Sequence, residues 1–421
     1  MVSLQAPKGT YDVLPWQQPL RQLVLREAER IFTRAGYGRI STPAFEDTEL
    51  FSRGVGPSSD IVRKEMYTFA DRGGRSLTLK PEGTAPVVRA YIQHGMHKLP
   101  QPVKLWYFER MYRFENPQAG RYREHYQLGV EAVGSDDPML DAEIILLLSE
   151  LYETLMVPEV QLRLASMGCP DCRPPYLEKL KAHLDSLDDG LCRDCLERRQ
   201  LNPLRVFDCK KESCALLLEK APKLIENLCK ACGEHFKKVQ GYLDIFKRPY
   251  RLDGTLVRGF DYYTRTTFEF ECERLGAQKG IGGGGRYDEL VEEIGGPPTA
   301  AAGFGTGMER IILALESADI KTEGAHTDVF FMVLSDAARP QAFARMLELR
   351  KLGFTADMDY AGRKAKGQMK QADRLGAGLT VIIGEDELKS GKATVRNMEK
   401  GEQAEVELEG LAGYLAELLW Q

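Results

Sequence analysis

Two segments in which side chains alternate constrain the fold most strongly. Residues 103–115 and 126–133 each carry side chains that change face with a period of two, which is the period of a β-strand. On one face of the second segment, Gly129 stands between the polar side chains of Gln127 and Glu131. A glycine in this setting leaves room for a small polar ligand, although the solvent face of an antiparallel sheet has the same pattern. These segments therefore predict two sheet strands, one of them a candidate binding surface.

The bulk composition excludes several classes of protein. The chain has 421 residues, of which 43% are hydrophobic, so we expect two or three folded domains. Its formal net charge is −5, so nucleic acid would have to be bound by a local basic patch. The first residues show no basic region followed by an apolar run, and nowhere do about 18 apolar residues follow one another. We therefore expect a cytoplasmic protein that has no membrane partner.

The first part of the chain changes between helical and strand patterns. Residues 17–35 have apolar side chains at helical spacing. Residues 39–46 predict a strand whose internal proline, Pro43, suits a sheet edge or a dimer interface. Residues 65–80 predict a hairpin, and Thr84 is placed to cap the helix that follows it.

Two changes of pattern divide the rest of the chain. Residues 170–245 show helical stretches without a strong strand signal, which predicts an inserted helical module. After a polar linker near residues 317–327, strands and helices alternate in an order that predicts a compact C-terminal domain. We therefore expect a core of residues 1–169 and 246–320, the insertion, and a C-terminal domain of residues 328–421.

Charged groups in the second half of the core stand in settings that are unusual for a packed domain. Residues 256–263 hold Arg258, Asp261 and two tyrosines, although an exposed turn closed by an Arg–Asp pair explains this segment equally simply. Residues 280–288 are too rich in glycine for a stable element, so backbone or a ligand must approach closely there. Arg310 lies in the first turn of a predicted helix, a position that favours negative charge and therefore suggests an anionic ligand.

Together these stretches resemble the bacterial histidyl-tRNA synthetases, a family of class II aminoacyl-tRNA synthetases, over nearly the whole chain. Three stretches are similar to the sequence motifs of the class, and three more to signatures of the histidine family. The class motifs correspond to residues 39–46, residues 112–115 with the loop that follows, and residues 303–310. The histidine signatures correspond to residues 81–84, 258–263 and 283–288.

The resemblance implies a fold of the α+β class. It implies a class II antiparallel-sheet catalytic domain with a helical insertion, followed by a C-terminal α/β anticodon-binding domain, assembled as a homodimer. The implied reaction is the ATP-dependent activation of L-histidine to histidyl-adenylate, followed by transfer of histidine to the 3′ end of tRNA(His). Mg²⁺ would bridge the phosphates of ATP.

Arginines would carry the activation chemistry that the resemblance implies. Arg113 would hold the α-phosphate and the histidine carboxylate, and Arg310 the γ-phosphate end of ATP near the adenine. Glu115 would receive the adenine amino group. Arg258, which is expected to be catalytic together with Arg113, would place a guanidinium at the α-phosphate, where related enzymes use a further metal ion.

The resemblance also implies a pocket for histidine. Glu82, Thr84 and Gln127 would take the α-ammonium group, and Glu131 and Tyr262 would bind the two ring nitrogens. Apolar analogues would be rejected, because they would leave the buried Glu131 without a partner. The full set of expected histidine-binding residues is Glu82, Gly83, Thr84, Arg113, Gln127, Glu131, Arg258, Tyr262 and Tyr263.

Two basic clusters are candidates for contact with tRNA. Arg121 and Arg123, in the loop after the second class motif, would meet the acceptor end. In the C-terminal domain, Arg363, Lys366 and Lys370 recur at roughly helical spacing and would face the anticodon stem, although a solvated helix face explains the same charges.

Eight of the nine cysteines lie in closely spaced pairs within or beside the insertion, which exceeds what the family resemblance requires. Their spacing fits one or two structural Zn²⁺ ions with four thiolates each. The alternative is that buried thiols act as small hydrophobic side chains. The candidate ligands are Cys169, Cys172, Cys192, Cys195, Cys209, Cys214, Cys229 and Cys232.

Two other groups of proteins share parts of this pattern. The regulatory subunits of ATP phosphoribosyltransferase resemble the catalytic core and bind histidine, but they usually lack the anticodon domain and lose the ATP-binding arginines. This chain keeps the expected C-terminal domain and the arginines at positions 113, 258 and 310. Class II synthetases for threonine, proline or glycine would not carry the histidine signatures, so the histidine enzyme is the preferred interpretation.

Overall fold

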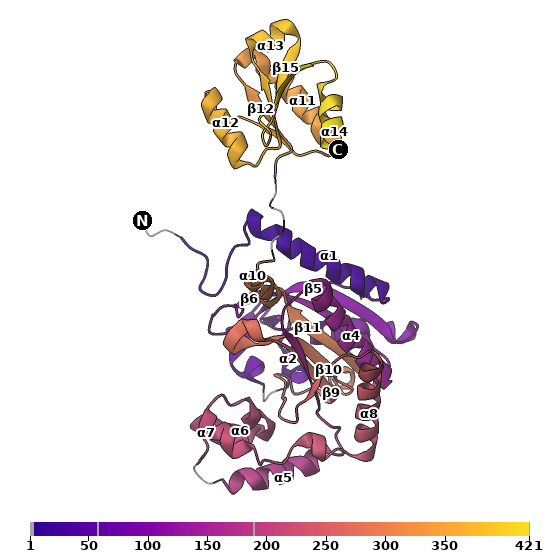
Figure 1. Cartoon of the computed structure of the whole chain (residues 1–421). Helices are drawn as coiled ribbons and strands as arrows, with labels where there is room; N and C mark the ends of the chain where they lie inside the picture. Colours follow the sequence, from indigo (N-terminus) through magenta and orange to yellow (C-terminus); the bar gives the residue numbers. More distant parts are fainter. Residues whose placement is uncertain are drawn as a thin grey trace. The chain divides into compact units, whose positions relative to one another are not determined.

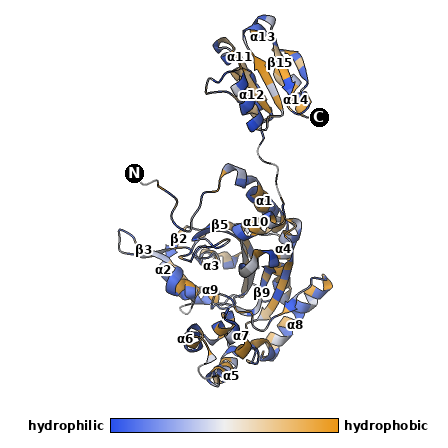
Figure 2. Ribbon diagram, turned by 60° about the vertical axis from the view of Figure 1, so that its left-hand side comes forward, coloured by the Kyte–Doolittle hydropathy of each residue, from blue (hydrophilic) through white to orange (hydrophobic). Residues whose placement is uncertain are grey.

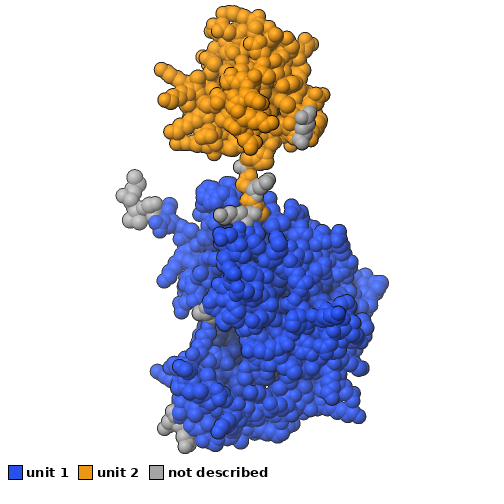
Figure 3. All heavy atoms as spheres, in the orientation of Figure 1, with its two compact units in different colours: residues 1–321 blue, residues 322–421 orange. Residues whose placement is uncertain are grey.

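The computed structural model describes residues 4–56, 59–187, 190–320, 322, 324 and 326–420. The chain forms two compact units, Met1–Lys321 and Thr322–Gln421 (Figure 3). Parts of the linker expected at residues 317–327 lie outside the described residues. Within the described segments, no helix combines the length and the apolar character needed to cross a membrane.

An eight-stranded sheet forms the centre of the first unit (Figure 1). In sheet order, its strands are β1 (Gly38–Arg39), β5 (Val103–Tyr112), β6 (Glu124–Val133), β11 (Ala301–Gly307), β10 (Gly280–Arg286), β9 (Thr264–Cys272), β7 (Val160–Ser166) and β8 (Arg251–Leu252). The six inner strands are antiparallel, and the short strands β1 and β8 pair in parallel at the two edges. The expected antiparallel sheet of an α+β fold is therefore confirmed.

Four helices pack against one face of this sheet. They are α1 (Gln18–Arg34), α4 (Pro138–Thr154), α8 (Lys230–Ile245) and α10 (Met308–Ser317). Helix α1 buries the stripe of apolar residues that its helical spacing predicts. In β6, Leu128 and Val130 point into this core. Because side chains alternate along a strand, Gln127, Gly129 and Glu131 face the side that the four helices leave open.

A three-stranded sheet flanks the first helices of the unit. It consists of β2 (Phe45–Asp47), β4 (Ser76–Leu79) and β3 (Tyr67–Ala70), with α2 (Thr48–Gly54) and α3 (Thr84–Gln93) in the intervening and following chain. The hairpin expected in residues 65–80 is confirmed. The single strand expected at residues 39–46 is wrong, because β1 and β2 belong to different sheets. Pro43 lies in the segment between β1 and β2. Because proline has no backbone N–H group, it cannot donate a hydrogen bond to a neighbouring strand.

The glycine-rich residues 280–286 form a central strand, β10, although we expected no stable element there. Both neighbours pair with β10, so its backbone is held from two sides. A Cβ atom at Gly284 would overlap the backbone of Gly303 on β11. The close approach of backbone that the glycines predicted is therefore present, but inside the sheet.

The helical insertion follows β7 and ends before β8 (Figure 1). Its elements are α5 (Arg173–Asp185), α6 (Arg193–Leu201), the 3-10 helix η5 (Pro203–Asp208), α7 (Glu212–Leu218), the 3-10 helix η6 (Leu224–Glu226) and α8. No strand occurs in the described part of residues 170–245, as expected. Between α5 and η6, most buried apolar residues of the insertion belong to one cluster with Tyr262, Tyr263 and Tyr287 of the core, whereas those of α8 pack in the main core.

The second unit is a five-stranded α/β domain. Its strands, in sheet order, are β13 (Ala356–Met358), β12 (Val329–Val333), β14 (Leu379–Ile383), β15 (Lys392–Asn397) and β16 (Gln403–Glu407). Its helices are α11 (Arg339–Lys351), α12 (Ala365–Arg374), α13 (Glu385–Ser390) and α14 (Leu411–Leu419). Figure 2 shows hydrophobic residues gathered on the strands in the middle of this unit. The expected order of strands and helices is confirmed, with the short α13 as an addition.

Candidate active site

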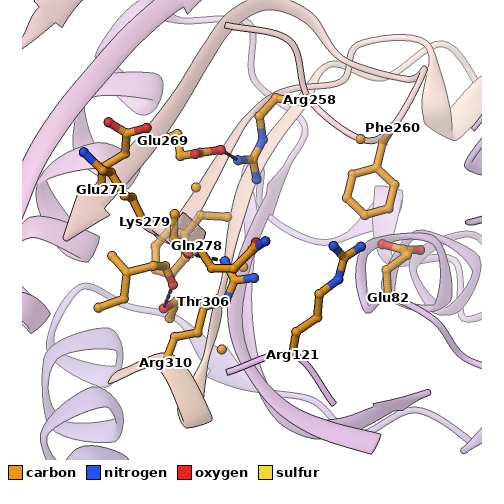
Figure 4. A pocket seen from close by; sticks show the side chains of 18 of the residues that line it. Glu82, Arg121, Arg258, Phe260, Glu269, Glu271, Gln278, Lys279, Thr306 and Arg310 are labelled. Carbon is orange, nitrogen blue, oxygen red and sulfur yellow. Dashed lines mark hydrogen bonds and ion pairs between the residues drawn. The ribbon is translucent and has the colours of Figure 1, made fainter. Parts of the chain in front are cut away.

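A cavity of about 700 Å³ lies on the face of the large sheet that the four helices leave open. Its walls come from β6, β9, β10 and β11, from the start of α10, and from the loops before β6 and before β9. Figure 4 shows Arg121, Arg258 and Arg310 turning their guanidinium groups into this space from three different elements. The predicted site residues that line it are Glu82, Thr84, Arg113, Glu115, Arg121, Gln127, Arg258, Tyr262, Tyr263 and Arg310.

Two of these arginines are held in place by backbone carbonyls and a third by a carboxylate. Arg113 and Arg310 each donate from Nε to a backbone carbonyl, at 2.7 and 3.1 Å. Burial lowers the pKa of both guanidinium groups. Arg258 forms an ion pair with Glu269, a residue of β9 (Figure 4). Carbonyl partners do not neutralise a guanidinium, so this arrangement favours a ligand with several anionic oxygens.

The loop between β5 and β6 brings a carboxylate to the cavity. Glu115 is buried and forms an ion pair with Arg121, which also lies 3.8 Å from Glu65. Arg123 does not line the cavity: its guanidinium stacks 4.0 Å from the centre of the Phe114 ring. The two arginines predicted to contact tRNA therefore differ, since one faces the cavity and the other supports the loop.

Glu82 caps helix α3, which is the role that we expected of Thr84. The Glu82 carboxylate accepts hydrogen bonds from the backbone N–H groups of Thr84 at 2.7 Å and Ala85 at 2.8 Å. The residue at the N-cap position is Gly83. The Thr84 hydroxyl donates instead to Glu131 at 2.8 Å. The expected cap is therefore wrong, because an acidic side chain two residues earlier reaches the same N–H groups.

Glu131 lies beside the cavity without lining it and is 1% exposed. Its carboxyl group accepts hydrogen bonds from the hydroxyls of Thr84, Tyr107 and Tyr287. Burial raises the pKa of Glu131 to about 8, with a smaller contribution from the negative charge of Glu82, against the opposing effect of the hydroxyl donors. The carboxyl group is therefore largely protonated at neutral pH in the free protein.

The space above Gly129, which the sequence left for a ligand, is filled by Tyr107 of β5. A Cβ atom at either Gly129 or Gly83 would overlap the Tyr107 ring. The Tyr107 hydroxyl accepts a hydrogen bond from Gln127 Nε2 at 3.0 Å and donates to Glu131 at 3.3 Å. The expectation of a ligand directly above Gly129 is therefore wrong, and the glycine admits an aromatic ring that holds two predicted site residues.

The segment of residues 256–263 is not the exposed turn that was the alternative interpretation. Tyr262 and Tyr263 are each 5% exposed. The Tyr262 ring stacks on Phe260 with centroids 5.1 Å apart, and the Arg258 guanidinium lies 5.9 Å from the Tyr263 ring centroid. This aromatic packing fixes the backbone on which Arg258 is carried.

Sequence analysis missed several residues of the site. Tyr107 lies in an alternating strand and Tyr287 follows the glycine-rich strand, so their positions gave a weak signal. Glu269 belongs to a run of alternating side chains, which is also only a weak indication of a site. Residues 207–210 of the insertion line the cavity as well, and no sequence pattern indicated this.

The predicted basic cluster of the second unit lies at the start of α12. The side chains of Lys366 and Lys370 are exposed and stand four residues apart on the helix. Such spacing places them on one helix face. Arg363, just before the helix, forms an ion pair with Asp359 at 2.6 Å. Within the part of the chain that the structure describes, Lys366 and Lys370 therefore form no ion pair with a carboxylate, whereas Arg363 does.

The eight paired cysteines gather into two groups of four. The neck group is Cys169, Cys172, Cys229 and Cys232, and the wall group is Cys192, Cys195, Cys209 and Cys214. Within each group the sulfur atoms lie within 4.8 Å of one another, and all eight cysteines are free of disulfides. Four thiols converging on one point match the donor set of a structural zinc site. The pairing of the cysteines, which the sequence left open, is thus given by the fold.

Known proteins share both the sequence and the fold of this chain. A family model described as histidyl-tRNA synthetase matches residues 9–311, and one described as an anticodon binding domain matches residues 328–418. The histidine–tRNA ligase of Halothermothrix orenii is 49% identical over 99% of this chain and 100% of its own length. That of Pelotomaculum thermopropionicum is 48% identical over 98% of this chain and 97% of its own length.

A solved structure supports the same relationship. The apo histidyl-tRNA synthetase of S. aureus is 37% identical and has a TM-score of 0.82, covering 98% of this chain and 100% of that chain. The catalytic-core motifs, the α/β domain and the full-length identity agree. This chain therefore belongs to the histidyl-tRNA synthetase family, as its motifs predicted.

Proposed function

We propose that this site activates L-histidine with ATP to form histidyl-adenylate and pyrophosphate, and then transfers histidine to the 3′ end of tRNA(His). The observation that carries the proposal is that Arg113, Arg258 and Arg310 surround one cavity that also adjoins the buried carboxyl group of Glu131. Guanidinium groups suit the phosphates of ATP, and a buried carboxyl group suits an imidazole.

In the activation step, a carboxylate oxygen of histidine attacks the α-phosphorus of ATP, and the bond from that phosphorus to the oxygen of pyrophosphate breaks. Negative charge builds on the phosphates, so cations that are already in place lower the barrier. Arg113 would hold the α-phosphate and the histidine carboxylate, and Arg258 would be a second catalytic cation at the α-phosphate. Arg310 would bind the γ-phosphate end, and Glu115 would receive the adenine amino group.

Mg²⁺ bound with ATP would neutralise phosphate charge during this step. The carboxylates that line the cavity offer it few free ligands, because Glu115, Glu269 and Glu271 each form an ion pair with an arginine. Mg²⁺ usually keeps several waters and takes one or two carboxylates beside the substrate phosphates, so the residues fit this ion. We propose Glu269 as a protein ligand, which would become free for the ion when the phosphates of ATP take over its partner Arg258 (Figure 4).

Histidine would be recognised at both ends of the molecule. Glu82, Thr84 and Gln127 would take its α-ammonium group, while Glu131 and Tyr262 would bind the two ring nitrogens. The support is that Glu131 is buried among three hydroxyl donors, so a ligand without a ring N–H would leave its charged form stabilised by these hydroxyls alone. Such a site discriminates against apolar analogues without an editing step.

The remaining partners are proposed from the family and from the placement of charge. Arg121 and Arg123 would meet the acceptor end of tRNA(His), and Arg363, Lys366 and Lys370 its anticodon stem. We also propose that the chain acts in the cytoplasm as a homodimer. The support for the dimer is the family resemblance of residues 39–46, which lie outside the central strands of the sheet.

Each of the two cysteine groups would hold one structural Zn²⁺. In the neck group, Cys169 Sγ lies 3.8 Å from both Cys172 Sγ and Cys229 Sγ. A zinc ion bound by four thiolates at about 2.3 Å separates its sulfur atoms by about 3.8 Å. A closed set of four thiolates leaves no position for a substrate, so these ions would stabilise the insertion.

The direct test of the proposed activity is histidine-dependent exchange of pyrophosphate into ATP in the absence of tRNA. We expect the wild-type protein to catalyse exchange and the Arg258→Ala variant to lose it by about 100-fold or more, because a cation at the α-phosphate is removed. Histidine binding without exchange in the wild type would contradict the proposal and favour a regulatory, non-catalytic protein. A folded Arg258→Ala variant with wild-type exchange would contradict only the role of Arg258.

A further inference from the structure

We infer that the metal site of the wall group positions the histidine-binding segment of residues 256–263, so that loss of this site impairs histidine activation. The inference rests on the proposed function, because it assumes both histidine activation and zinc binding. The ion of the wall group would therefore act on the active site, whereas a purely structural ion would stabilise only the insertion.

The wall group has the geometry of a metal site. Cys192 Sγ and Cys209 Sγ are 3.8 Å apart, which is about the sulfur–sulfur separation of a tetrahedral zinc site. Cys195 and Cys214 are fully buried. Cys192 is the N-cap residue of α6, and Cys195 lies in the first turn of the same helix, so both lie at its N-terminal end.

One ligand of this group is itself part of the active-site wall. Cys209 directly follows η5, and it lines the cavity together with Phe207, Asp208 and Lys210. The group joins this wall to α6 and α7, which carry its other three cysteines at their starts. A metal bound here would therefore hold the cavity wall against two helices of the insertion.

Two hydrogen bonds link this wall to the histidine-binding segment. Arg205 Nη2 donates to the carbonyl of Gly259 at 3.3 Å, and its Nη1 donates to Asp208 at 3.1 Å. Asn202 Nδ2 donates to Asp261 Oδ1 at 3.1 Å. These bonds lie on both sides of Phe260, between Arg258 and the tyrosines that the proposed function uses.

Apolar packing continues the same connection. Leu204 and Val206 of η5 are buried in one cluster with Tyr262 and Tyr263, and Cys195 and Cys214 belong to that cluster. Because close-packed side chains transmit small displacements, a wall released from its metal would disturb the tyrosines as well as the backbone of residues 259–261. The segment that the displacement reaches is the one that would bind the imidazole.

The neck group is placed differently. Its cysteines lie near the two ends of the insertion, after β7 and at the start of α8, and none of them lines the cavity. We therefore expect the two groups to differ in their effect on the site, although both stabilise the insertion.

The test compares metal content with histidine kinetics in the full-length protein. We expect two zinc ions per wild-type chain by elemental analysis, and one in the Cys192→Ala/Cys209→Ala variant. This variant should raise the KM for histidine in pyrophosphate exchange by about tenfold or more, with a smaller change in the KM for ATP. Loss of one zinc without a change in the histidine KM would overturn the inference and leave the zinc proposal standing.

A second variant separates positioning from folding of the metal site. Arg205→Ala removes the bond to Gly259 and keeps all eight cysteines, so it should retain two zinc ions and raise the histidine KM about fivefold. Arg205→Lys should recover part of this loss. Arg199→Ala is the matched control, because Arg199 bonds within the insertion, and its KM should equal that of the wild type.

The outcomes distinguish this inference from the proposals on which it rests. Equal histidine KM values for Arg205→Ala and Arg199→Ala would overturn the inference. A wild-type protein purified under reducing conditions without zinc would overturn both the zinc proposal and the inference. A wild-type protein with two zinc ions but no histidine-dependent exchange would overturn the proposed activity.

Discussion

At the scale of single residues, the burial of Glu131 costs stability at neutral pH, and the proposed function assigns this residue to recognition of the imidazole. A carboxylate in water has a pKa near 4.5, whereas burial raises the pKa of Glu131 to about 8. Between these two values the folded protein binds a proton that the unfolded chain does not bind. The free energy of unfolding therefore falls as pH rises from about 4.5 to about 8, as far as this residue is concerned. A ligand that donates to the carboxylate offsets the cost.

The Glu131→Gln variant tests this cost and this assignment, because glutamine has similar size and does not titrate. We expect its melting temperature, relative to wild type, to rise between pH 5 and pH 8.5 in the absence of histidine. Its KM for histidine in pyrophosphate exchange should increase about tenfold or more, since a hydrogen bond to a charged group is lost. The exposed residue Glu316 supplies the control: Glu316→Gln should change neither quantity. Parallel pH profiles of wild type and Glu131→Gln would contradict the assignment.

At the scale of elements, a buried ionic network joins β10, α4 and α8. Arg286 is completely buried and pairs with Asp141, which also contacts His235 Nε2 at 2.7 Å. Burial opposes ionisation of Asp141, but the hydrogen bond with His235 and the charge of Arg286 outweigh it and lower the pKa. Arg286 belongs to a stretch that resembles a histidine signature, yet its contacts are those of a clamp between the sheet and two helices.

Replacing Asp141 by asparagine should destabilise the first unit by about 1–3 kcal/mol, because it leaves the buried charge of Arg286 with Asp288, at 3.1 Å, as its remaining carboxylate partner. Urea unfolding at neutral pH measures this loss. A carboxylate with a lowered pKa stabilises the fold above its unfolded pKa, so the difference from wild type should shrink as pH falls through the folded pKa. Asp136→Asn changes an exposed carboxylate and should have little effect. Equal stability of Asp141→Asn and wild type would contradict the role of the network.

Local periodicity predicted many of these elements, and long-range contacts account for most of what it missed. Helix α1, the hairpin and the order of the C-terminal domain follow from patterns within single segments. Strand β10 could not be predicted, because glycine carries no hydropathy pattern and its pairing depends on two neighbours. The wall of residues 207–210 could not be predicted either, because contacts between distant parts of the chain bring it to the cavity. One such contact is the hydrogen bond between Asn202, directly before η5, and Asp261, which lies 59 residues away in the sequence.

At the scale of the whole molecule, the proposed function assigns activation and recognition of a large substrate to different units. The cavity lies within Met1–Lys321, and the exposed lysines of α12 lie in Thr322–Gln421. The net charge of −5 makes a local basic face necessary for any nucleic acid contact. A change in the second unit should therefore affect the charging of tRNA and leave the first step intact.

The variant Lys366→Glu/Lys370→Glu tests this separation. We expect histidine-dependent pyrophosphate exchange to stay at the wild-type rate, while the KM for tRNA(His) in charging rises about tenfold or more at low salt. The effect should weaken as salt concentration rises, because salt screens phosphate contacts. Lys389→Glu/Lys400→Glu, which reverses two other exposed charges in the same unit, is the matched control. Equal KM values for the two variants would contradict an anticodon-stem contact through α12.

The neck at which Cys169 and Cys229 meet has a consequence for how such a chain can diversify. Their sulfur atoms are 3.8 Å apart, so the chain between them leaves and returns at nearly one point. Apart from residues 202–210, which contact the active site, a segment closed in this way can be lengthened or shortened while the register of β7 against β9 stays the same. Residues 173–228 thus leave the sheet and return to it through one narrow connection, so changes in their length are absorbed outside the sheet.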